Sequence, residues 1–205
     1  DLWMLGICSV LLLCTAGGLC ACDSASEAEP VLPTAARPDQ PLLFLHTYDN
    51  YAEDQTGYHR AWLMTADGSV LDATDAVYGE DWENWAANLL TLAATASAQE
   101  TVSTVSADDL PILYGFAQSD LPEDAEMIYY GSYACDYGTD SLYLLQKTGD
   151  TEYQQVRLCY TGDSQGCLDD RLVTAFCNWM SEQGYFDLQA PFSYEEIQKR
   201  KEDQS

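Results

Sequence analysis

The segment YHRAWLMTADGSVLDATDAV, residues 58–77, decides how the chain folds. Aromatic and apolar residues over Tyr58–Thr65 are typical of a β-strand. Ala66-Asp67-Gly68-Ser69 follows as a hairpin turn, because Gly68 can adopt the positive φ that such turns need. A second strand is then expected from Val70 to Val77. The segment therefore predicts an antiparallel hairpin.

The flanking segments extend this hairpin into a sheet with a helix. The apolar run Leu42–Leu45 predicts a preceding strand, separated from Tyr58 by the polar, glycine-containing loop Asp49–Gly57. After Gly79, apolar residues recur at helical spacing, and Glu80 and Asp81 precede them at the positive end of the helix dipole. These residues are Trp82, Trp85, Ala86, Leu89, Leu90 and Ala93. We expect this helix to lie on the sheet.

The second half of the chain repeats this order. Strands are predicted at Met127–Ala134, Ser141–Lys147 and Tyr153–Tyr160. A helix follows, with Asp169 and Asp170 at its start and Gly184 as its stop. One face of this helix carries Leu172, Val173, Phe176, Cys177 and Met180. A shorter helix after 106–109 joins the two halves.

The predicted fold class is therefore α+β. We expect an antiparallel sheet with helices on one face, arranged as a duplicated three-strand-plus-helix unit. The alternative is an antiparallel α+β domain without internal duplication, which shows a similar order of elements.

The charge of the chain restricts its partners. The 205 residues include 34 acidic and 8 basic side chains, a formal net charge of −26. Such a field repels nucleic acids and anionic lipid headgroups, so both are excluded as partners. Attraction to cations and to basic surfaces is compatible with it. The acidic residues are scattered through turns and helix starts, which is typical of a charged surface that keeps a domain soluble.

The first residues carry an export signal. An apolar run from Leu2 to Leu13 leads to Leu19-Cys20-Ala21-Cys22, and the chain becomes polar at Asp23. This pattern resembles the lipoprotein signal peptides of bacteria. The resemblance implies that residues 1–21 are removed and that Cys22 receives the lipid that anchors the protein to the cell membrane. The alternative is a membrane-spanning helix from Leu2 to Cys22, and both interpretations place the rest of the chain outside the cytoplasm.

The remaining sequence divides into three parts. Residues 22–41 are rich in Ser, Ala, Glu and Pro, a composition that predicts a disordered tether. Residues 42–187 are long enough for one α+β domain with a single core. Residues 188–205 form a polar C-terminal tail with a short helix. In general style the domain resembles small lipoproteins of Gram-positive bacteria.

One motif suggests catalysis. Gly162-Asp163-Ser164-Gln165-Gly166 matches G-x-S-x-G, between a predicted strand and a predicted helix, as a nucleophile elbow requires. A serine hydrolase would need Ser164 to meet His46 or His59. Both histidines precede the serine, whereas in that hydrolase fold the histidine follows it. We therefore expect a turn bounded by glycines, and serine hydrolase is the alternative.

Metal and cofactor sites are not expected. His46 and His59 lack the spacing of metal ligands. The acidic loops near Asp49, Asp136–Asp140 and Asp163 offer oxygen ligands for calcium, but none matches an EF-hand. Solvated loop carboxylates are the favoured interpretation, and a calcium-dependent glycan binder is a further alternative.

Tyrosines interleaved with Asp, Ser and Gly predict a recognition face, because each combines a large contact area with a polar tip. The candidate binding residues are Tyr48, Tyr51, Tyr58, Tyr130, Tyr133 and Tyr137. Packing of these side chains on the sheet explains the same pattern.

Four cysteines remain in the domain, and an extracytoplasmic location favours their oxidation. Cys135 and Cys167 are the preferred disulfide pair, with Cys159 and Cys167 as the second choice. Cys167 and Cys177 flank a helix and are expected to lie too far apart to bond. Cys177 is expected to be a buried thiol.

These patterns together predict a non-catalytic, lipid-anchored binding or accessory module outside the cytoplasm. An envelope protein or a glycan is the expected ligand, and no cofactor is implied.

Overall fold

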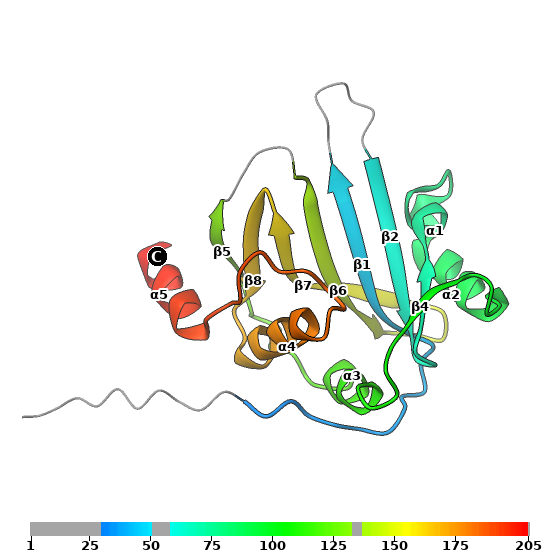
Figure 1. Ribbon diagram of the computed structural model, residues 1–205, viewed down its shortest axis with the longest axis horizontal. Helices are drawn as coiled ribbons and strands as arrows, with labels where there is room; N and C mark the ends of the chain where they lie inside the picture. Colours follow the sequence, from blue (N-terminus) through cyan, green and yellow to red (C-terminus); the bar gives the residue numbers. More distant parts are fainter. Residues whose placement is uncertain (1–29, 51–57, 133–136, 205) are drawn as a thin grey trace, which may run out of the picture.

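A computed structural model describes residues 30–50, 58–132 and 137–204 (Figure 1). Its centre is an eight-stranded sheet in the order β4-β3-β2-β1-β6-β7-β8-β5, and all neighbouring strands are antiparallel. The strands are β1 Leu42–Asn50, β2 Tyr58–Thr65, β3 Ser69–Asp72, β4 Thr101–Thr104, β5 Met127–Ser132, β6 Thr139–Lys147, β7 Tyr153–Gly162 and β8 Ser164–Leu168. The predicted α+β class with an antiparallel sheet is confirmed.

The hairpin predicted over residues 58–77 forms, with one difference. Gly68 adopts a φ of 87°, and β2 and β3 pair on either side of the turn. The second strand was expected to reach Val77, but β3 ends at Asp72. The Asp72 carboxylate accepts hydrogen bonds from the backbone N–H and the hydroxyl of Thr74, which turns the chain into helix α1, Thr74–Tyr78. Local side-chain bonds of this kind compete with a strand ladder.

Helices cover both faces of the sheet, where the sequence predicted one. The 3₁₀ helix η1 (Trp82–Asn84) and helix α2 (Trp85–Thr95) follow α1, and α2 lies over the face that carries Leu45, Ala61 and Leu63. Helices α3 (Leu110–Ala117) and α4 (Arg171–Glu182) cover the face that carries Phe44, Met64 and Leu142. The reason lies in β1, whose continuous apolar run points successive side chains to opposite faces.

The predicted duplication is visible in the strands and not in the helices. The meanders β1-β2-β3 and β6-β7-β8 run outward in opposite directions from the central β1–β6 pair. A helix follows each meander, but α2 and α4 lie on opposite faces. The edge strands β4 and β5 complete the sheet.

Stacked phenylalanines form the centre of the larger core. The rings of Phe116 (α3) and Phe176 (α4) lie 3.7 Å apart at 8°, and Phe44 stacks on Phe176 at 5.2 Å. All three side chains are buried. Helix α4 begins and ends as predicted, since the Asp170 side chain accepts from the N–H of Val173 and Gly184 follows the helix with a φ of 75°.

The described part of the predicted tether is ordered. Leu32 and Ala35 pack against the larger core, and the N–H of Ala35 donates to the carbonyl oxygen of Pro111 at 2.9 Å. The Gln118 amide donates to the carbonyl oxygen of Ala36, also at 2.9 Å. The prediction of disorder was therefore wrong for residues 30–41. The apolar side chains among the prolines pack against the core, and the backbone of the segment bonds to α3. Residues 22–29 lie outside the described residues, as does the predicted signal with Cys22.

The C-terminal tail is part of the domain. It contains the predicted short helix, α5 (Tyr194–Gln204), which packs beside β5 through the fully buried Ile197. The Tyr130 hydroxyl donates to Glu196 at 2.8 Å, and Lys201 pairs with Asp169. In the part of the chain that the structure describes, no helix has the length and apolar character needed to cross a membrane.

Candidate functional site

Polar and aromatic side chains gather on the half of one sheet face that α3 and α4 leave uncovered. In β1 and β2 the register places His46 opposite Trp62, Tyr48 opposite Arg60 and Asn50 opposite Tyr58. Because side chains alternate along a strand, these residues share one face. Their exposures run from half-buried to exposed. We call this surface the aromatic face and define it as His46, Tyr48, Tyr58, Arg60 and Trp62.

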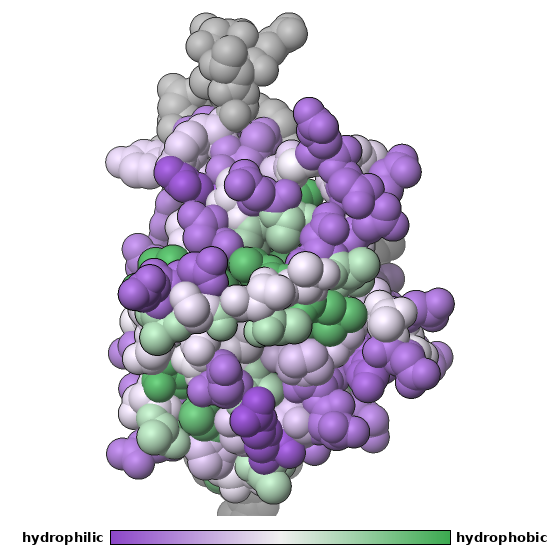
Figure 2. Space-filling view, turned by 90° about the vertical axis from the view of Figure 1, so that its right-hand side faces the viewer, coloured by the Kyte–Doolittle hydropathy of each residue, from purple (hydrophilic) through white to green (hydrophobic). Residues whose placement is uncertain are grey.

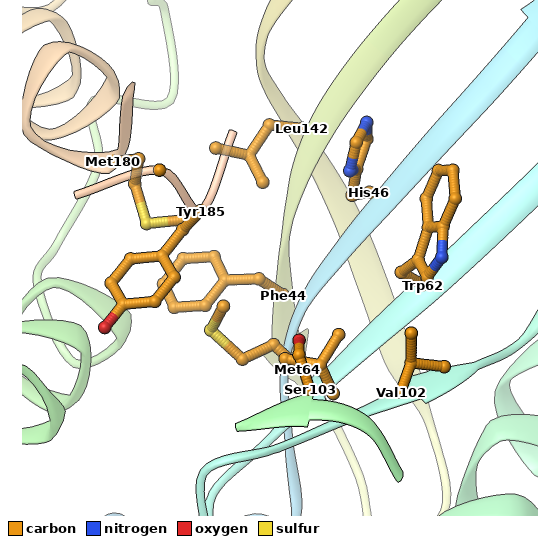
Figure 3. Close-up of a pocket in the computed structure, with 11 residues that line it drawn as sticks. Phe44, His46, Trp62, Met64, Val102, Ser103, Leu142, Met180 and Tyr185 are labelled. Carbon is orange, nitrogen blue, oxygen red and sulfur yellow. The ribbon is translucent and has the colours of Figure 1, made fainter. Parts of the chain in front are cut away.

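A cleft of about 220 Å³ opens at the lower end of the aromatic face (Figure 3). Figure 3 shows His46 and Trp62 on one side of the cleft and Met180, Tyr185 and Phe44 on the other. Its remaining walls include Met64, Val70, Leu142, and Val102 and Ser103 of the edge strand β4. Its lining is mostly apolar, so the cleft suits a single apolar side chain or a group of similar size.

His46 is fixed between a carboxylate and two rings. Its Nε2 lies 2.6 Å from Oδ1 of Asp140, which β6 places beside it across the sheet. The imidazole lies 4.7 Å from the indole of Trp62 and 4.9 Å, edge-on, from the ring of Phe186. These contacts orient the imidazole at the mouth of the cleft.

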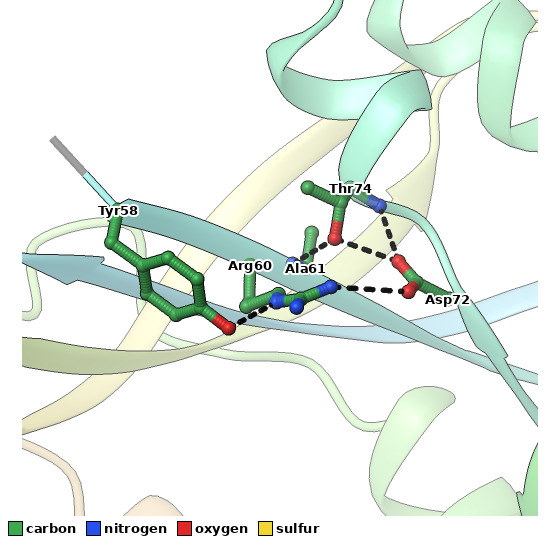
Figure 4. Close-up of polar contacts among 5 residues, drawn as sticks. All are labelled: Tyr58, Arg60, Ala61, Asp72 and Thr74. Atoms are coloured by element: carbon green, nitrogen blue, oxygen red, sulfur yellow. Dashed lines mark hydrogen bonds and ion pairs between the residues drawn. The ribbon is translucent and has the colours of Figure 1, made fainter. Parts of the chain in front are cut away.

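A second polar cluster borders the aromatic face (Figure 4). Figure 4 shows the Arg60 guanidinium between the hydroxyl of Tyr58, to which its Nε donates, and the carboxylate of Asp72, 3.7 Å away. The Thr74 hydroxyl accepts from the N–H of Ala61 and donates to Asp72. The hydrogen bonds from Thr74, helped by Arg60, hold the pKa of Asp72 below its ordinary value. Arg60 is thus held in place while its side chain is still partly exposed.

The structure brings together three of the tyrosines proposed for recognition. Tyr48 and Tyr58 pack edge to face with ring centroids 6.0 Å apart, and the Tyr48 hydroxyl donates to the carbonyl oxygen of Tyr137 at 2.9 Å. Tyr58 and Tyr137 are exposed. Tyr51 and Tyr133 lie outside the described residues.

Tyr130 does not belong to the aromatic face. It lies on β5, the edge strand at the far side of the sheet, and is buried edge-on against Phe192 at 5.4 Å. Burial, together with the hydrogen bond to Glu196, raises the pKa of Tyr130 to about 12. The prediction failed because α5 covers this tyrosine, and that contact joins segments 66 residues apart.

Arg60 and Trp62 were missed by the sequence analysis. The signal that could have found them is the period of two, since Tyr58, Arg60 and Trp62 alternate with His59, Ala61 and Leu63 along β2. The same alternation in β1 gives His46 and Tyr48.

Ser164 does not lie in the expected strand-to-helix turn. It is the first residue of β8 and pairs with Ser132 of β5, so its loop joins two strands. His46 contacts Asp140, as described above, and Nδ1 of His59 lies 2.8 Å from Asp49 on the opposite sheet face. The structure therefore contradicts the elbow context on which the hydrolase alternative was based.

The loop carboxylates considered for calcium are engaged in hydrogen bonds. Asp49 accepts from Tyr78, Asp140 contacts His46, and Asp163 accepts from the N–H of Tyr137. Across residues 30–50, 58–132 and 137–204, no group of three or more metal-ligating side chains is positioned to hold a metal ion. Asp136 lies outside these ranges.

Three thiols cluster in the larger core. Cys159 and Cys167 face each other on β7 and β8, and Cys177 of α4 lies within hydrogen-bond reach of both. All three are free and fully buried. Cys167 is a free thiol in the core under α4. Cys135, its expected disulfide partner, lies outside the described residues. The expected separation of Cys167 from Cys177 was wrong, since α4 folds back onto β8. Burial raises the pKa of Cys159 and, more strongly, of Cys177.

Comparison with known proteins does not assign the chain to a family. No family model, no curated protein and no solved structure matches it.

Proposed function

We propose that the protein is a non-catalytic, lipid-anchored binding module outside the cytoplasm, and that the aromatic face is the surface that contacts a partner protein of the cell envelope. The location follows from the resemblance of residues 1–22 to a lipoprotein signal. The partner class follows from the composition of the aromatic face.

The observation that carries this proposal is the placement of Tyr58 and Arg60 on the same sheet face as Trp62, which lines the apolar cleft. Tyr, Trp and Arg are the residue types that contribute most to binding energy at protein interfaces. Tyr58 and Arg60 fix each other, which lowers the entropy lost on binding. The cleft beside Trp62 would take one apolar anchor from the partner. The net charge of the chain favours a partner with a basic surface around that anchor.

A glycan is the alternative ligand of the same surface. Exposed tyrosines with polar neighbours are compatible with it, but the apolar cleft between Met64, Met180 and Tyr185 offers few polar groups to a sugar. The protein partner is therefore the function we favour.

Site-specific photocrosslinking tests the proposal in cells that make the full-length protein. A photoreactive residue replaces Tyr58 on the aromatic face or, as a matched control, Thr91 on the exposed side of α2. We expect a discrete protein adduct from position 58 and none from position 91. The adduct should disappear when Trp62→Ala is added, because this change removes a wall of the cleft. Equal adducts from both positions, or none from position 58, would contradict the proposal.

A further inference from the structure

A second cavity lies on the opposite side of the sheet from the aromatic face. Its volume is about 680 Å³, within the usual size of small-molecule sites. Its walls come from β2, β7 and the segment from α1 to the start of α2. They are formed by His59, Val77, Tyr78, Trp82, Trp85 and Gln155. None of these residues lines the first cleft.

Aromatic rings dominate this cavity. The rings of His59 and Tyr78 stack at 4.8 Å, and Trp82 and Trp85 belong to consecutive helical segments above them. Trp82 keeps 62% of its surface exposed, whereas tryptophan side chains in folded domains are on average largely buried. Figure 2 looks onto the side of the molecule that carries α1 and α2 in Figure 1, and it shows apolar residues gathered across the middle of a largely hydrophilic surface. Exposed aromatic surface beside a cavity is typical of a binding site.

Acidic side chains contact or adjoin several residues that line this cavity. Asp49 Oδ1 lies 2.8 Å from His59 Nδ1 and accepts from the Tyr78 hydroxyl at 2.7 Å. Burial and the contact with Asp49 raise the pKa of Tyr78 well above its ordinary value, so the hydroxyl stays protonated and donates. Three exposed acidic residues flank Trp82 in the chain, namely Glu80, Asp81 and Glu83.

Among the residues that the structure describes, no lysine or arginine lines the cavity. Arg157 is the cation on the same strand and face as Gln155, and it donates to Ser141 and lies 4.4 Å over the ring of Tyr160. It is therefore already engaged with neighbouring side chains. The field at the cavity favours a positively charged ligand.

We propose that this cavity is a binding site for an organic cation, with a quaternary ammonium group held against the faces of Tyr78, Trp82 and Trp85. Aromatic faces attract such cations through their negative electrostatic potential, and the attraction is strongest with Trp. The carboxylate of Asp49 and the acidic residues around Trp82 supply a favourable field. This site is independent of the partner surface proposed above.

Calorimetric titration of the purified protein with choline, at about 150 mM salt to screen nonspecific attraction, tests the proposal. The control ligand is 3,3-dimethyl-1-butanol, which has the shape of choline without its charge. We expect saturable binding of choline and at least about tenfold weaker binding of the neutral isostere. Trp82→Ala should weaken choline binding by about tenfold, because Trp82 is exposed and its loss leaves the fold intact.

The matched control variant is Tyr137→Ala, which removes an exposed ring that does not line the second cavity. It should bind choline like the unchanged protein. Equal affinity for choline and its isostere would overturn the proposal, as would unchanged binding by Trp82→Ala or a lack of saturable choline binding. Loss of the crosslinked partner without loss of choline binding would affect only the first proposal.

Discussion

Gly115 of α3 lies directly against the carbonyl group of Pro33, so that a Cβ at position 115 would stand 2.2 Å from the Pro33 oxygen. Only a glycine lets the two backbones approach this closely. The contact holds residues 30–41 on the domain and therefore sets where the chain leaves it.

Gly115→Ala is predicted to loosen this contact. The new methyl group has only backbone atoms to displace, so we expect a loss of about 1–3 kcal/mol in the free energy of unfolding, measured by urea denaturation. Limited proteolysis should cut within residues 30–41 faster than in the unchanged protein. Gly149→Ala is the control, because its Cβ would meet only the flexible side chain of Glu152. Equal stability and equal proteolysis of Gly115→Ala would show that the segment is not held there.

The elements that the sequence predicted are those whose signals are local. The β2 strand, the turn at Gly68 and helix α4 each follow from a pattern within one short segment. The end of β3 is also set by a local contact, the hydrogen bond from the Thr74 N–H to Asp72. The spacing of apolar residues does not reveal this bond, so the strand was predicted to continue. Burial of Leu32 depends on α3, far along the chain, and composition alone therefore predicted disorder for its segment.

The candidate site was predictable only where its residues lie close together in the sequence. Tyr48 and Tyr58 belong to adjacent strands, so their spacing indicates a shared surface. The contact of His46 with Asp140 spans 94 residues and needs the β1–β6 pairing, which no local pattern contains. The second cavity depends on the position of α1 and η1 over the sheet. The strand expected over Val70–Val77 would have left no residues for α1 and so did not predict this cavity.

Asp72 should make stability depend on pH. Its pKa is lower in the folded protein than the value of about 3.9 in the unfolded chain. The folded state then binds this proton less readily, so the ionised carboxylate stabilises the fold above about pH 4 and the contribution disappears as the pH falls through the folded pKa. Asp72→Asn should therefore be less stable than the unchanged protein near pH 7, by under about 1 kcal/mol because the group is half exposed. The two proteins should converge in acid.

Urea denaturation at a series of pH values measures this difference. Asp150→Asn, in the β6–β7 hairpin, reports the effect of losing one acidic charge elsewhere. A constant difference between Asp72→Asn and the unchanged protein from pH 7 to pH 3 would contradict the assignment.

The buried thiols are predicted to resist alkylation until the protein unfolds. Cys159, Cys167 and Cys177 have no exposed surface, and burial raises the pKa of two of them, so little reactive thiolate forms. Mass spectrometry after iodoacetamide treatment without reductant should find all three unmodified in the native protein and all three modified in denaturant. Protection of Cys167 that persists in denaturant would reveal a disulfide and contradict the free thiol of the structure.

Membrane attachment is predicted to depend on Cys22. If the signal is processed as the resemblance implies, Cys22→Ala should release the domain from the membrane fraction or leave an unprocessed precursor. Cys20→Ala should remain attached, because the position before Cys20 carries Leu19 and not a small residue. Identical fractionation and processing of the two variants would argue against lipid attachment at Cys22.

Ser164 is predicted not to act as a nucleophile. Activation would require an imidazole nitrogen at about 2.6–3.2 Å from its Oγ and backbone donors directed at the oxyanion. Both histidines contact aspartates instead, His46 with Asp140 and His59 with Asp49. A fluorophosphonate probe should therefore leave Ser164 unlabelled, and Ser164→Ala should retain the crosslinked partner and lose under about 0.5 kcal/mol of stability. Stoichiometric labelling that disappears in Ser164→Ala would restore the hydrolase as the function of this protein, since only an activated serine reacts with such a probe.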